Sequence, residues 1–288
     1  MNKLANVSVG GKNPVRIMGI LNASPESFFR QSVKTSKNAI TDTVKKMETD
    51  GADFIDVGGM STAPYLSTIV SEKIESKRVL NAIKHIQNCS NLPISVDTCR
   101  SSVAKLALDN GVEIINDISG LKFDPKMIAM LSNYDASLIL CAFSPKTVLG
   151  NQVAAAKKLL QESLKLAKAA NVSPSRVVLD PAIGFFRKSG KSPFFTKINS
   201  DWFLRDLQII QNLRLIKQRY PVLISVSNKS FIGRLLGKED PSERLFGSIA
   251  AEVVSVINGA DIVRTHNVSH TKDAISVASK LLRSHKGL

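Results

Sequence analysis

Short apolar runs alternate with amphipathic segments along nearly the whole chain. Parallel strands that are buried on both faces are continuously apolar, and residues 177–179 and 222–226 nearly fit that description. Amphipathic segments between such runs are typical of helices that cover a sheet, so the pattern predicts repeated β-α units. Strands are expected near residues 15–21, 53–58, 93–97, 112–116, 137–143, 177–180, 221–227 and 260–264, and helices near 36–50, 69–87, 100–110, 125–133, 151–170, 202–219, 241–258 and 271–284.

Eight successive units of this kind predict an α/β fold, a (β/α)8 TIM barrel. The chain has 288 residues, is 43% hydrophobic and contains no Pro/Gly-rich linker, so we expect one domain over residues 1–288. The clearest helix signal lies in the seventh connection. Asp240 can cap a helix that begins at Pro241, with Glu243 completing a capping box. Gly259 can end that helix.

A polar residue follows each of several apolar runs. In a (β/α)8 barrel these positions meet at one mouth, so residues far apart in the sequence can form one site. Taken singly, they have structural explanations: Asp97 and Asp180 can cap helices, and Asn116 is a common turn residue. Their shared position at strand ends favours a site instead. The residues with this placement are Asn22, Ser61, Thr62, Asp97, Asn116, Asp117, Asp180, Lys229, Arg264 and His266.

The net charge of +15 invites comparison with nucleic-acid-binding proteins, because clustered Lys and Arg bind phosphates. The charges are mostly dispersed over helix-like segments, and no helix-turn-helix, zinc-finger or aromatic RNA-binding motif accompanies them. We therefore expect no nucleic-acid partner. Residues 187–197 differ, because four basic residues follow a strand end directly and either attract an anionic ligand or form a solvated loop.

Neither a membrane segment nor a leader peptide is expected. No apolar stretch approaches the roughly 20 residues needed to cross a bilayer, and residues 1–6 lack the apolar core of a signal peptide. Cys89, Cys99 and Cys141 show no CxxC spacing and are odd in number, so neither a disulfide framework nor a zinc site is expected. We expect a soluble cytoplasmic protein with no membrane partner.

Seven segments at the predicted strand ends carry a resemblance to a known family. Any one of them would be weak, but chance does not account for seven in the same order. The chain resembles the dihydropteroate synthases, which are pterin-binding barrel enzymes. The segments are residues 17–28 (IMGILNASPESF), 51–64 (GADFIDVGGMSTAP), 95–98 (SVDT), 115–120 (INDISG), 179–185 (LDPAIGF), 228–233 (NKSFIG) and 264–268 (RTHNV).

The resemblance implies a transferase that joins 6-hydroxymethyl-7,8-dihydropterin diphosphate to the amino group of p-aminobenzoate and releases diphosphate. It places the pterin pocket at Asp97, Asn116, Asp180 and Lys229, whose side chains can supply the hydrogen bonds that an aminopyrimidine ring requires. A dihydropterin stabilises the cation left when diphosphate departs. The enzyme therefore has to hold the ring, neutralise the leaving group and position the amine.

The resemblance also places the diphosphate at Asn22, Arg264 and His266, with a magnesium ion at Asn22. The guanidinium of Arg264 can donate two parallel hydrogen bonds to phosphate oxygens, whereas the imidazole of His266 can donate hydrogen bonds and assist proton movement. Lys229 and Asp97, together with Arg264 and His266, are implied to be the catalytic residues. A homodimer is implied as well.

The acceptor pocket is implied to include Ser230, at the start of a helix. The Ser230 hydroxyl and the neighbouring N–H groups can face the carboxylate of aminobenzoate. The resemblance also implies that Thr62 and Pro64, in the loop after the second strand, bind the diphosphate or the arylamine. Phe185 and Pro181 can wall the aromatic ring, although ordinary core packing explains Phe185 equally well.

The chain departs from the family pattern mainly around the diphosphate and the acceptor, and the pterin pocket is nearly intact. Ala63 replaces a usual Arg, so a cation expected near the reacting groups is missing. Cys141 and Ala142 replace Met-His, Asn228 replaces a basic residue, Ala182 replaces Gly, and residues 29–31 are altered.

Three other functions stay open on the sequence. The enzyme could use a phosphoribosylated arylamine, as in methanopterin-type pathways, with Arg187 or Lys191 binding the extra anion. It could be a methyltransferase that passes a methyl group from a tetrahydropterin to a corrinoid protein, although those enzymes do not normally carry residues 229–233 or 264–266. It could also be an inactive pterin-binding paralogue, given Ala63.

Overall fold

The computed structural model describes residues 1–26 and 33–284. Its centre is a parallel sheet in the order β11-β12-β3-β4-β5-β6-β7-β8. A parallel bridge between Leu179 and Val222 joins the first and last of these strands, so the predicted eight-stranded barrel is confirmed. Its strands are β3 (Arg16–Asn22), β4 (Phe54–Gly58), β5 (Ile94–Asp97), β6 (Ile114–Asp117), β7 (Ser137–Cys141), β8 (Val177–Asp180), β11 (Leu223–Ile224) and β12 (Ile262–Thr265).

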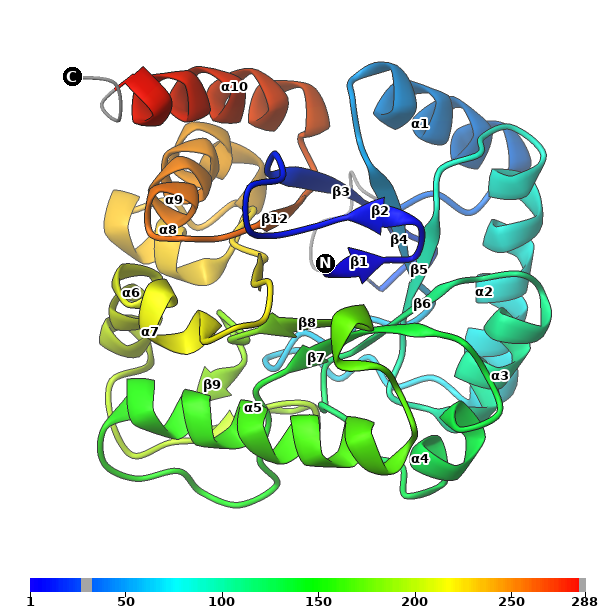
Figure 1. Ribbon diagram of the computed structural model, residues 1–288, viewed down its shortest axis with the longest axis horizontal. Coiled ribbons are helices and arrows are strands. Elements are labelled where there is room, and N and C mark those ends of the chain that lie inside the picture. The colour runs from blue at the N-terminus through cyan, green and yellow to red at the C-terminus, as the bar shows by residue number, and fades with distance from the viewer. Residues whose placement is uncertain (27–32, 285–288) are drawn as a thin grey trace.

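Helices surround the barrel, as Figure 1 shows, and follow the order that the amphipathic segments predicted, with α8 as an additional helix outside the predicted ranges. No helix within the described ranges is long and apolar enough to cross a membrane. The departures at residues 29–31 lie outside the described residues. The helices are α1 (Lys37–Thr49), α2 (Glu72–Gln87), α3 (Ser101–Asp109), α4 (Lys126–Leu131), α5 (Gln152–Ala169), α6 (Trp202–Gln211), α7 (Leu213–Lys217), α8 (Ser230–Leu236), α9 (Leu245–Ile257) and α10 (Val268–Ser284).

The period of two along each strand separates the barrel interior from the layer beneath the helices. On β4, Phe54 packs inside the barrel, whereas Ile55 and Val57 join the core between the sheet and the helices. On β12, Ile262 likewise lies inside. On β4, β6, β8 and β12 the residue two positions after the inward apolar side chain is polar, so part of a polar layer lies above the apolar one. Its members include Asp56, Asn116, Asp180 and Arg264.

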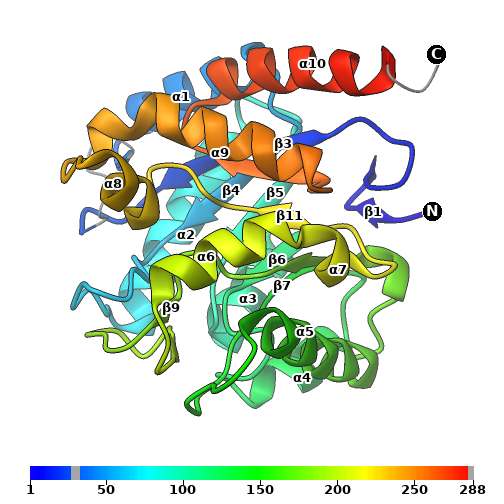
Figure 2. The same cartoon turned by 90° about the vertical axis from the view of Figure 1, so that its left-hand side faces the viewer.

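A short N-terminal hairpin, not predicted from the sequence, covers the opposite end of the barrel. It consists of β1 (Lys3–Leu4) and β2 (Val7–Ser8), which pair antiparallel. The N–H of Ala5 donates to Oγ of Ser137, the first residue of β7, at 2.9 Å, and Leu4 is fully buried in the inner core. Figures 1 and 2 show this hairpin beside the strand ends. Because the hairpin packs on that end of the inner core, a site formed by the polar layer is expected at the carboxyl ends of the strands.

Two helix predictions were wrong in detail. The helix expected over residues 202–219 is divided at Asn212 into α6 and α7. The helix expected from residue 241 begins as a 3-10 turn, η3 (Pro241–Arg244), before α9. Asp240 does cap this turn, because its side chain accepts a hydrogen bond from the N–H of Ser242 at 2.8 Å. Pairing between β9 (Phe186–Arg187) and β10 (Thr196–Lys197) was also not predicted.

Glu252 on α9 is fully buried against α10 and β12. The Thr271 hydroxyl donates to its Oε2 at 2.7 Å, and Oε1 has no hydrogen-bond partner in the described part of the chain. Burial raises the pKa of Glu252 from 4.5 to about 7, although the Thr271 hydrogen bond acts in the opposite direction. The folded protein therefore holds this proton at pH values where the unfolded chain has released it.

We predict that the free energy of unfolding falls as the pH rises from 4.5 to about 7, because the unfolded chain binds fewer protons there. The Glu252 contribution to this loss should reach about 3 kcal/mol and stay constant at higher pH. Glu252→Gln keeps the side-chain shape and removes the titration. Urea unfolding of both proteins at about pH 5 and about pH 8 measures the difference. Parallel pH profiles would show that Glu252 does not titrate in this way.

Candidate active site

A cavity of about 70 Å³ opens at the carboxyl ends of the barrel strands. Most of the site residues predicted from the sequence line it. Asn116, Asp117, Asp180 and Pro181 do not, because they are buried at or just after the ends of β6 and β8. The predicted residues that line the cavity are Asn22, Thr62, Pro64, Asp97, Phe185, Lys229, Ser230, Arg264 and His266.

Arg264 reaches across the mouth of the barrel to two carboxylates. Its Nε lies 2.6 Å from Oδ2 of Asp56, and its Nη2 lies 3.0 Å from Oδ2 of Asp97. Asn116 donates to the same Asp56 oxygen from Nδ2 at 3.2 Å. Asp56 was not predicted, because it lies inside the apolar β4 run rather than at its end. A charge in an otherwise apolar strand, two residues after the inward-facing Phe54, was the available signal.

The carboxylates keep unused hydrogen-bonding capacity. Oδ1 of Asp97 and Oδ1 of Asp56 are both buried and have no partner among residues 1–26 and 33–284. Burial raises the pKa of Asp97 to about 7, because its effect and the repulsion from Asp56 outweigh the attraction of Arg264. Burial lowers the pKa of Arg264, but the two carboxylates more than reverse this and raise it, so the guanidinium stays charged. A buried orphan acceptor is costly unless a ligand supplies a donor.

The helix-cap explanation does not hold for Asp97. The first N–H of α3, that of Ser101, is instead bonded to Oδ2 of Asp124 at 2.8 Å. Asp180 does act in a turn, since its Oδ1 accepts from the N–H of Ala182 at 2.7 Å. Ala182 has φ of +58°, in the left-handed region that favours glycine, which explains why glycine would suit this position better.

The loop after Asp180 is held from behind by a buried ion pair on α6. Nη1 of Arg205 lies 2.9 Å from Oδ1 of Asp206, and the same guanidinium donates to the carbonyls of Pro181 and Ala182 at 2.6 and 3.1 Å. Oδ2 of Asp206 accepts from the N–H of Gly184 at 3.0 Å. Neighbouring residues of one helix thus position the backbone between Asp180 and Gly184. Pro181, expected to wall the aromatic ring, is buried here and does not line the cavity.

Lys229 faces this loop from the N-cap position of α8. Its Nζ lies 4.2 Å from the centroid of the Phe185 ring, so Phe185 contacts a cavity residue as well as the core. Burial, followed by the charge of Arg264, lowers the pKa of Lys229 to about 8, against the opposing effect of Asp180. The ammonium is therefore the main form near neutral pH, and it loses its proton more easily than an exposed lysine does.

His266 lies at the mouth after β12. Its Nδ1 is 3.0 Å from Oγ of Ser227, and which atom donates depends on the tautomer. Burial lowers the pKa of His266 to about 3, assisted by the positive charges of Arg264 and Lys229. The imidazole is thus neutral at physiological pH, and it can offer one N–H to an anion. Assistance to proton movement by His266 stays a prediction.

The cavity lining also contains the residues implied for the acceptor. Thr62 and Pro64 line the cavity together with Ser230, and so does Ala63, whose methyl group carries no charge. Arg187 supplies a guanidinium to this lining, with its Nη2 donating to Oγ of Ser230 at 2.7 Å. The remaining basic residues of the segment behave differently: Lys188, Lys191 and Lys197 are exposed and do not line the cavity.

Asn22 ends β3 at the cavity wall and could offer a metal its amide oxygen. Nowhere in the described ranges do three or more His, Cys, Asp or Glu side chains form a group that could hold a metal ion. Mg²⁺ in phosphate-transfer sites is commonly bound by one or two protein oxygens together with substrate phosphates and water. The donor set therefore fits an ion that arrives with a diphosphate and does not fit an all-protein metal cage.

Comparison with known proteins agrees with this geometry. The family model for pterin binding enzymes matches residues 18–266. The dihydropteroate synthase of Bacillus subtilis is 37% identical over 257 residues, covering 89% of this chain and 85% of that protein. A dihydropteroate synthase structure from Coxiella burnetii in complex with pteroic acid has a TM-score of 0.80 at 33% identity, with 94% of each chain covered. The Thermus thermophilus dihydropteroate synthase in complex with 6HMPPP has a TM-score of 0.77 at 29% identity, covering 93% of this chain and 95% of that one. Because the family model spans most of the chain and relatives above 30% identity cover nearly all of it, this protein belongs to the dihydropteroate synthase family of pterin-binding enzymes.

Proposed function

We propose that this protein condenses 6-hydroxymethyl-7,8-dihydropterin diphosphate with p-aminobenzoate, forming a C–N bond and releasing diphosphate. The observation that carries the proposal is Oδ1 of Asp97, a buried acceptor without a hydrogen-bond partner among the described residues, in the wall of a cavity that Lys229 also lines. Oδ1 of Asp56, which shares the Arg264 counter-ion, is a second such acceptor behind this wall. The aminopyrimidine edge of a pterin carries adjacent N–H donors that match such acceptors. Lys229 can donate to the ring acceptors of the same molecule.

The diphosphate end of the substrate belongs beside Arg264, His266 and Asn22. Arg264 keeps a permanent charge, and the neutral His266 donates one N–H. A magnesium ion bound to the diphosphate would take one protein ligand from Asn22, and it would neutralise charge on the leaving group. These residues hold the leaving group, while Asp97 and Lys229 hold the ring still, so the acceptor amine can reach the methylene carbon.

The proposal is tested by diphosphate release from the purified protein with dihydropterin diphosphate and Mg²⁺. The reaction is run with p-aminobenzoate, with a phosphoribosylated arylamine and without acceptor. We expect release that depends on p-aminobenzoate and is lost in Lys229→Ala. Release only with the phosphorylated acceptor would assign the methanopterin-type reaction instead. Pterin binding without diphosphate release would indicate an inactive pterin-binding paralogue. If methyl transfer to a corrinoid protein is found as well, it would indicate the methyltransferase.

Gly184→Ala should weaken this activity through Lys229. Gly184 has φ of +86°, and a Cβ there would lie 3.0 Å from Cδ of Lys229. We predict that the variant lowers kcat/KM about tenfold by displacing the ammonium, and destabilises the fold by about 1–2 kcal/mol. Gly150→Ala is the matched control, because its φ is +76° and nothing lies within 4 Å of its Cβ position. It should lose similar stability but keep full activity, and equal kinetic losses in both variants would contradict the prediction.

The proposal includes a homodimer that acts in the cytoplasm. An apolar groove between α9 and α10 supports a second copy as its occupant, because Phe246, Val277 and Leu281 are 82%, 61% and 62% exposed there. The cytoplasmic location is supported by the free thiols of all three cysteines.

We predict that sedimentation of the wild type gives twice the chain mass of 31.3 kDa, and that Phe246→Glu shifts the protein to monomer. Burying a carboxylate in an apolar interface is strongly unfavourable, so the shift should exceed tenfold in the dimer dissociation constant. Lys272→Glu, on the same helix as Val277 but outside the groove, serves as the control. A wild type that sediments as a monomer would refute the dimer.

A further inference from the structure

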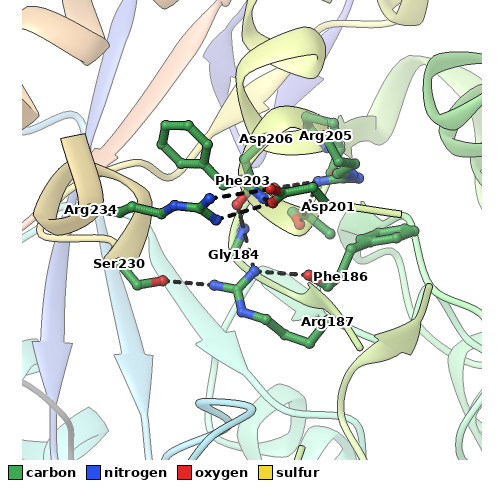
Figure 3. Close-up of polar contacts among 11 residues, drawn as sticks. Gly184, Phe186, Arg187, Asp201, Phe203, Arg205, Asp206, Ser230 and Arg234 are labelled. Atoms are coloured by element: carbon green, nitrogen blue, oxygen red, sulfur yellow. Dashed lines mark hydrogen bonds and ion pairs between the residues drawn. The ribbon is translucent and has the colours of Figure 1, made fainter. Parts of the chain in front are cut away.

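Arg187 is held rigidly on the acceptor side of the cavity. It lies on β9 and is 8% exposed, and its guanidinium carbon is 4.1 Å from the centroid of the Trp202 ring. Nη1 donates to the carbonyl of Phe186 at 2.8 Å, as Figure 3 shows. An arginine stacked and bonded in this way has lost its rotamer freedom during folding. It therefore pays little entropy when it binds a ligand.

The charge of Arg187 is not balanced within its own surroundings. The fully buried Asp206 carries a carboxylate 3.7 Å from Nη1, the one ion-pair partner of Arg187 within residues 1–26 and 33–284, but that carboxylate already pairs with Arg205 at 2.9 Å. Two guanidinium groups thus share one carboxylate. Arg234, also drawn in Figure 3, differs because it pairs with Asp201 at the surface and does not line the cavity. One net positive charge remains at the cavity wall beside Arg187 and favours an anionic ligand group.

Ser230 connects this charge to the ligand space. Its Oγ accepts from Nη2 of Arg187 at 2.7 Å, and both residues line the cavity. A hydroxyl has one proton to donate, and a guanidinium cannot accept it. The Ser230 proton is therefore directed away from Arg187, toward an acceptor in the cavity. Arg187 and Ser230 together present a cation and an oriented O–H, a combination that suits a carboxylate.

We propose that Arg187 determines acceptor specificity by binding the ring carboxylate of the arylamine together with Ser230. This inference rests on the proposed condensation and deepens it, because it names the group by which the acceptor is chosen. Asp206 positions both sides of the reaction: it holds the N–H of Gly184, next to Lys229, and it lies beside Arg187. The acceptor is thus selected as a carboxylated arylamine whose amine points toward the pterin.

Steady-state kinetics with two acceptors test the role of Arg187. p-Aminobenzoate carries the carboxylate, and p-aminobenzamide is its neutral counterpart of similar shape. In Arg187→Met we expect KM for p-aminobenzoate to rise by about 30-fold or more with a smaller change in kcat, while kcat/KM for p-aminobenzamide changes less than about threefold. Arg187→Lys retains the charge and should recover part of the preference. Lys188→Ala, an exposed neighbour outside the cavity, should resemble the wild type.

A binding measurement separates this inference from the proposed reaction. Calorimetric titration compares pteroate, which carries the carboxylate, with 6-hydroxymethylpterin, which lacks the aminobenzoate arm. Arg187→Met should weaken pteroate binding about tenfold or more and leave the pterin unchanged. That outcome supports the inference even if the wild type releases no diphosphate, in which case only the proposed reaction fails. Equal weakening of both ligands, equal kinetic losses for both acceptors, or no loss for p-aminobenzoate would overturn it.

Discussion

Asp97→Asn is expected to lower kcat/KM for dihydropterin diphosphate by about 10³-fold. The carboxylate can accept two hydrogen bonds from the aminopyrimidine edge, and its Oδ1 is buried without a partner in the described part of the chain. The Asn side chain places an NH₂ group where one carboxylate oxygen would accept from the pterin. One hydrogen bond to the ring is therefore lost, and the NH₂ group faces an N–H donor of the pterin. Hydrogen bonds to charged groups contribute about 1.5–3 kcal/mol each, and losing or opposing two of them gives this magnitude.

The change should act on pterin binding, so KM and the transition-state barrier should rise while the fold is kept. Arg264 still pairs with Asp56 at 2.6 Å in the variant, so the cluster retains a counter-ion. Diphosphate-release kinetics measure the activity, and circular dichroism checks the fold. Asp109→Asn, which alters an exposed carboxylate paired with Lys105, is the matched control. Activity within about threefold of wild type would exclude Asp97 as the ring contact.

The pH dependence should follow from the same residues. Asp97 must be ionised, so kcat/KM should rise with pH through about 7. Lys229 must be protonated, so kcat/KM should fall above about 8. The wild type is therefore expected to show a bell-shaped profile with its maximum between these values. Asp97→Asn should lose the acidic limb and keep the alkaline one, which a pH series on both proteins will measure.

Arg264→Met is expected to destabilise the fold by about 3–5 kcal/mol and to abolish measurable turnover. Arg264 is the shared counter-ion of Asp56 and Asp97, and its removal leaves two carboxylates close together in a buried place. It also removes the permanent charge proposed to bind the diphosphate. Urea unfolding at pH 7.5, about half a unit above the Asp97 pKa, measures the stability loss.

A double variant separates the two effects. Arg264→Met with Asp56→Asn removes one of the two like charges, so much of the stability should return. Turnover should not return, because the diphosphate still lacks its guanidinium. If Arg264→Met unfolds at the same urea concentration as the wild type, the buried cluster does not depend on Arg264. If the double variant regains activity, the role of Arg264 is structural and the proposed diphosphate contact is wrong.

The order of strands and helices could be read from periodicity alone, because hydrophobic spacing reports burial within a few residues of the chain. The polar residues at strand ends were identifiable for the same reason, since each interrupts an apolar run. The N-terminal hairpin was not predicted. Its strands are two residues each, too short to show a period, and they are held by the inner core and by Ser137 far along the chain.

The sequence by itself determined the barrel, the family resemblance and the ring of polar residues at its mouth, because these depend on local patterns and on their repetition. Only the tertiary structure decided which of them meet. Arg264 is hydrogen-bonded to Asp56, which lies 208 positions away in the sequence, and Arg187 is hydrogen-bonded to Ser230, which lies 43 positions away. Such pairs form only when the sheet closes into a barrel and the strand register places the two side chains at the same level along the barrel axis. Neither barrel closure nor strand register can be predicted from the residues next to each partner in the sequence. Charge balance at the cavity wall, and with it the choice of acceptor, therefore belongs to the folded molecule.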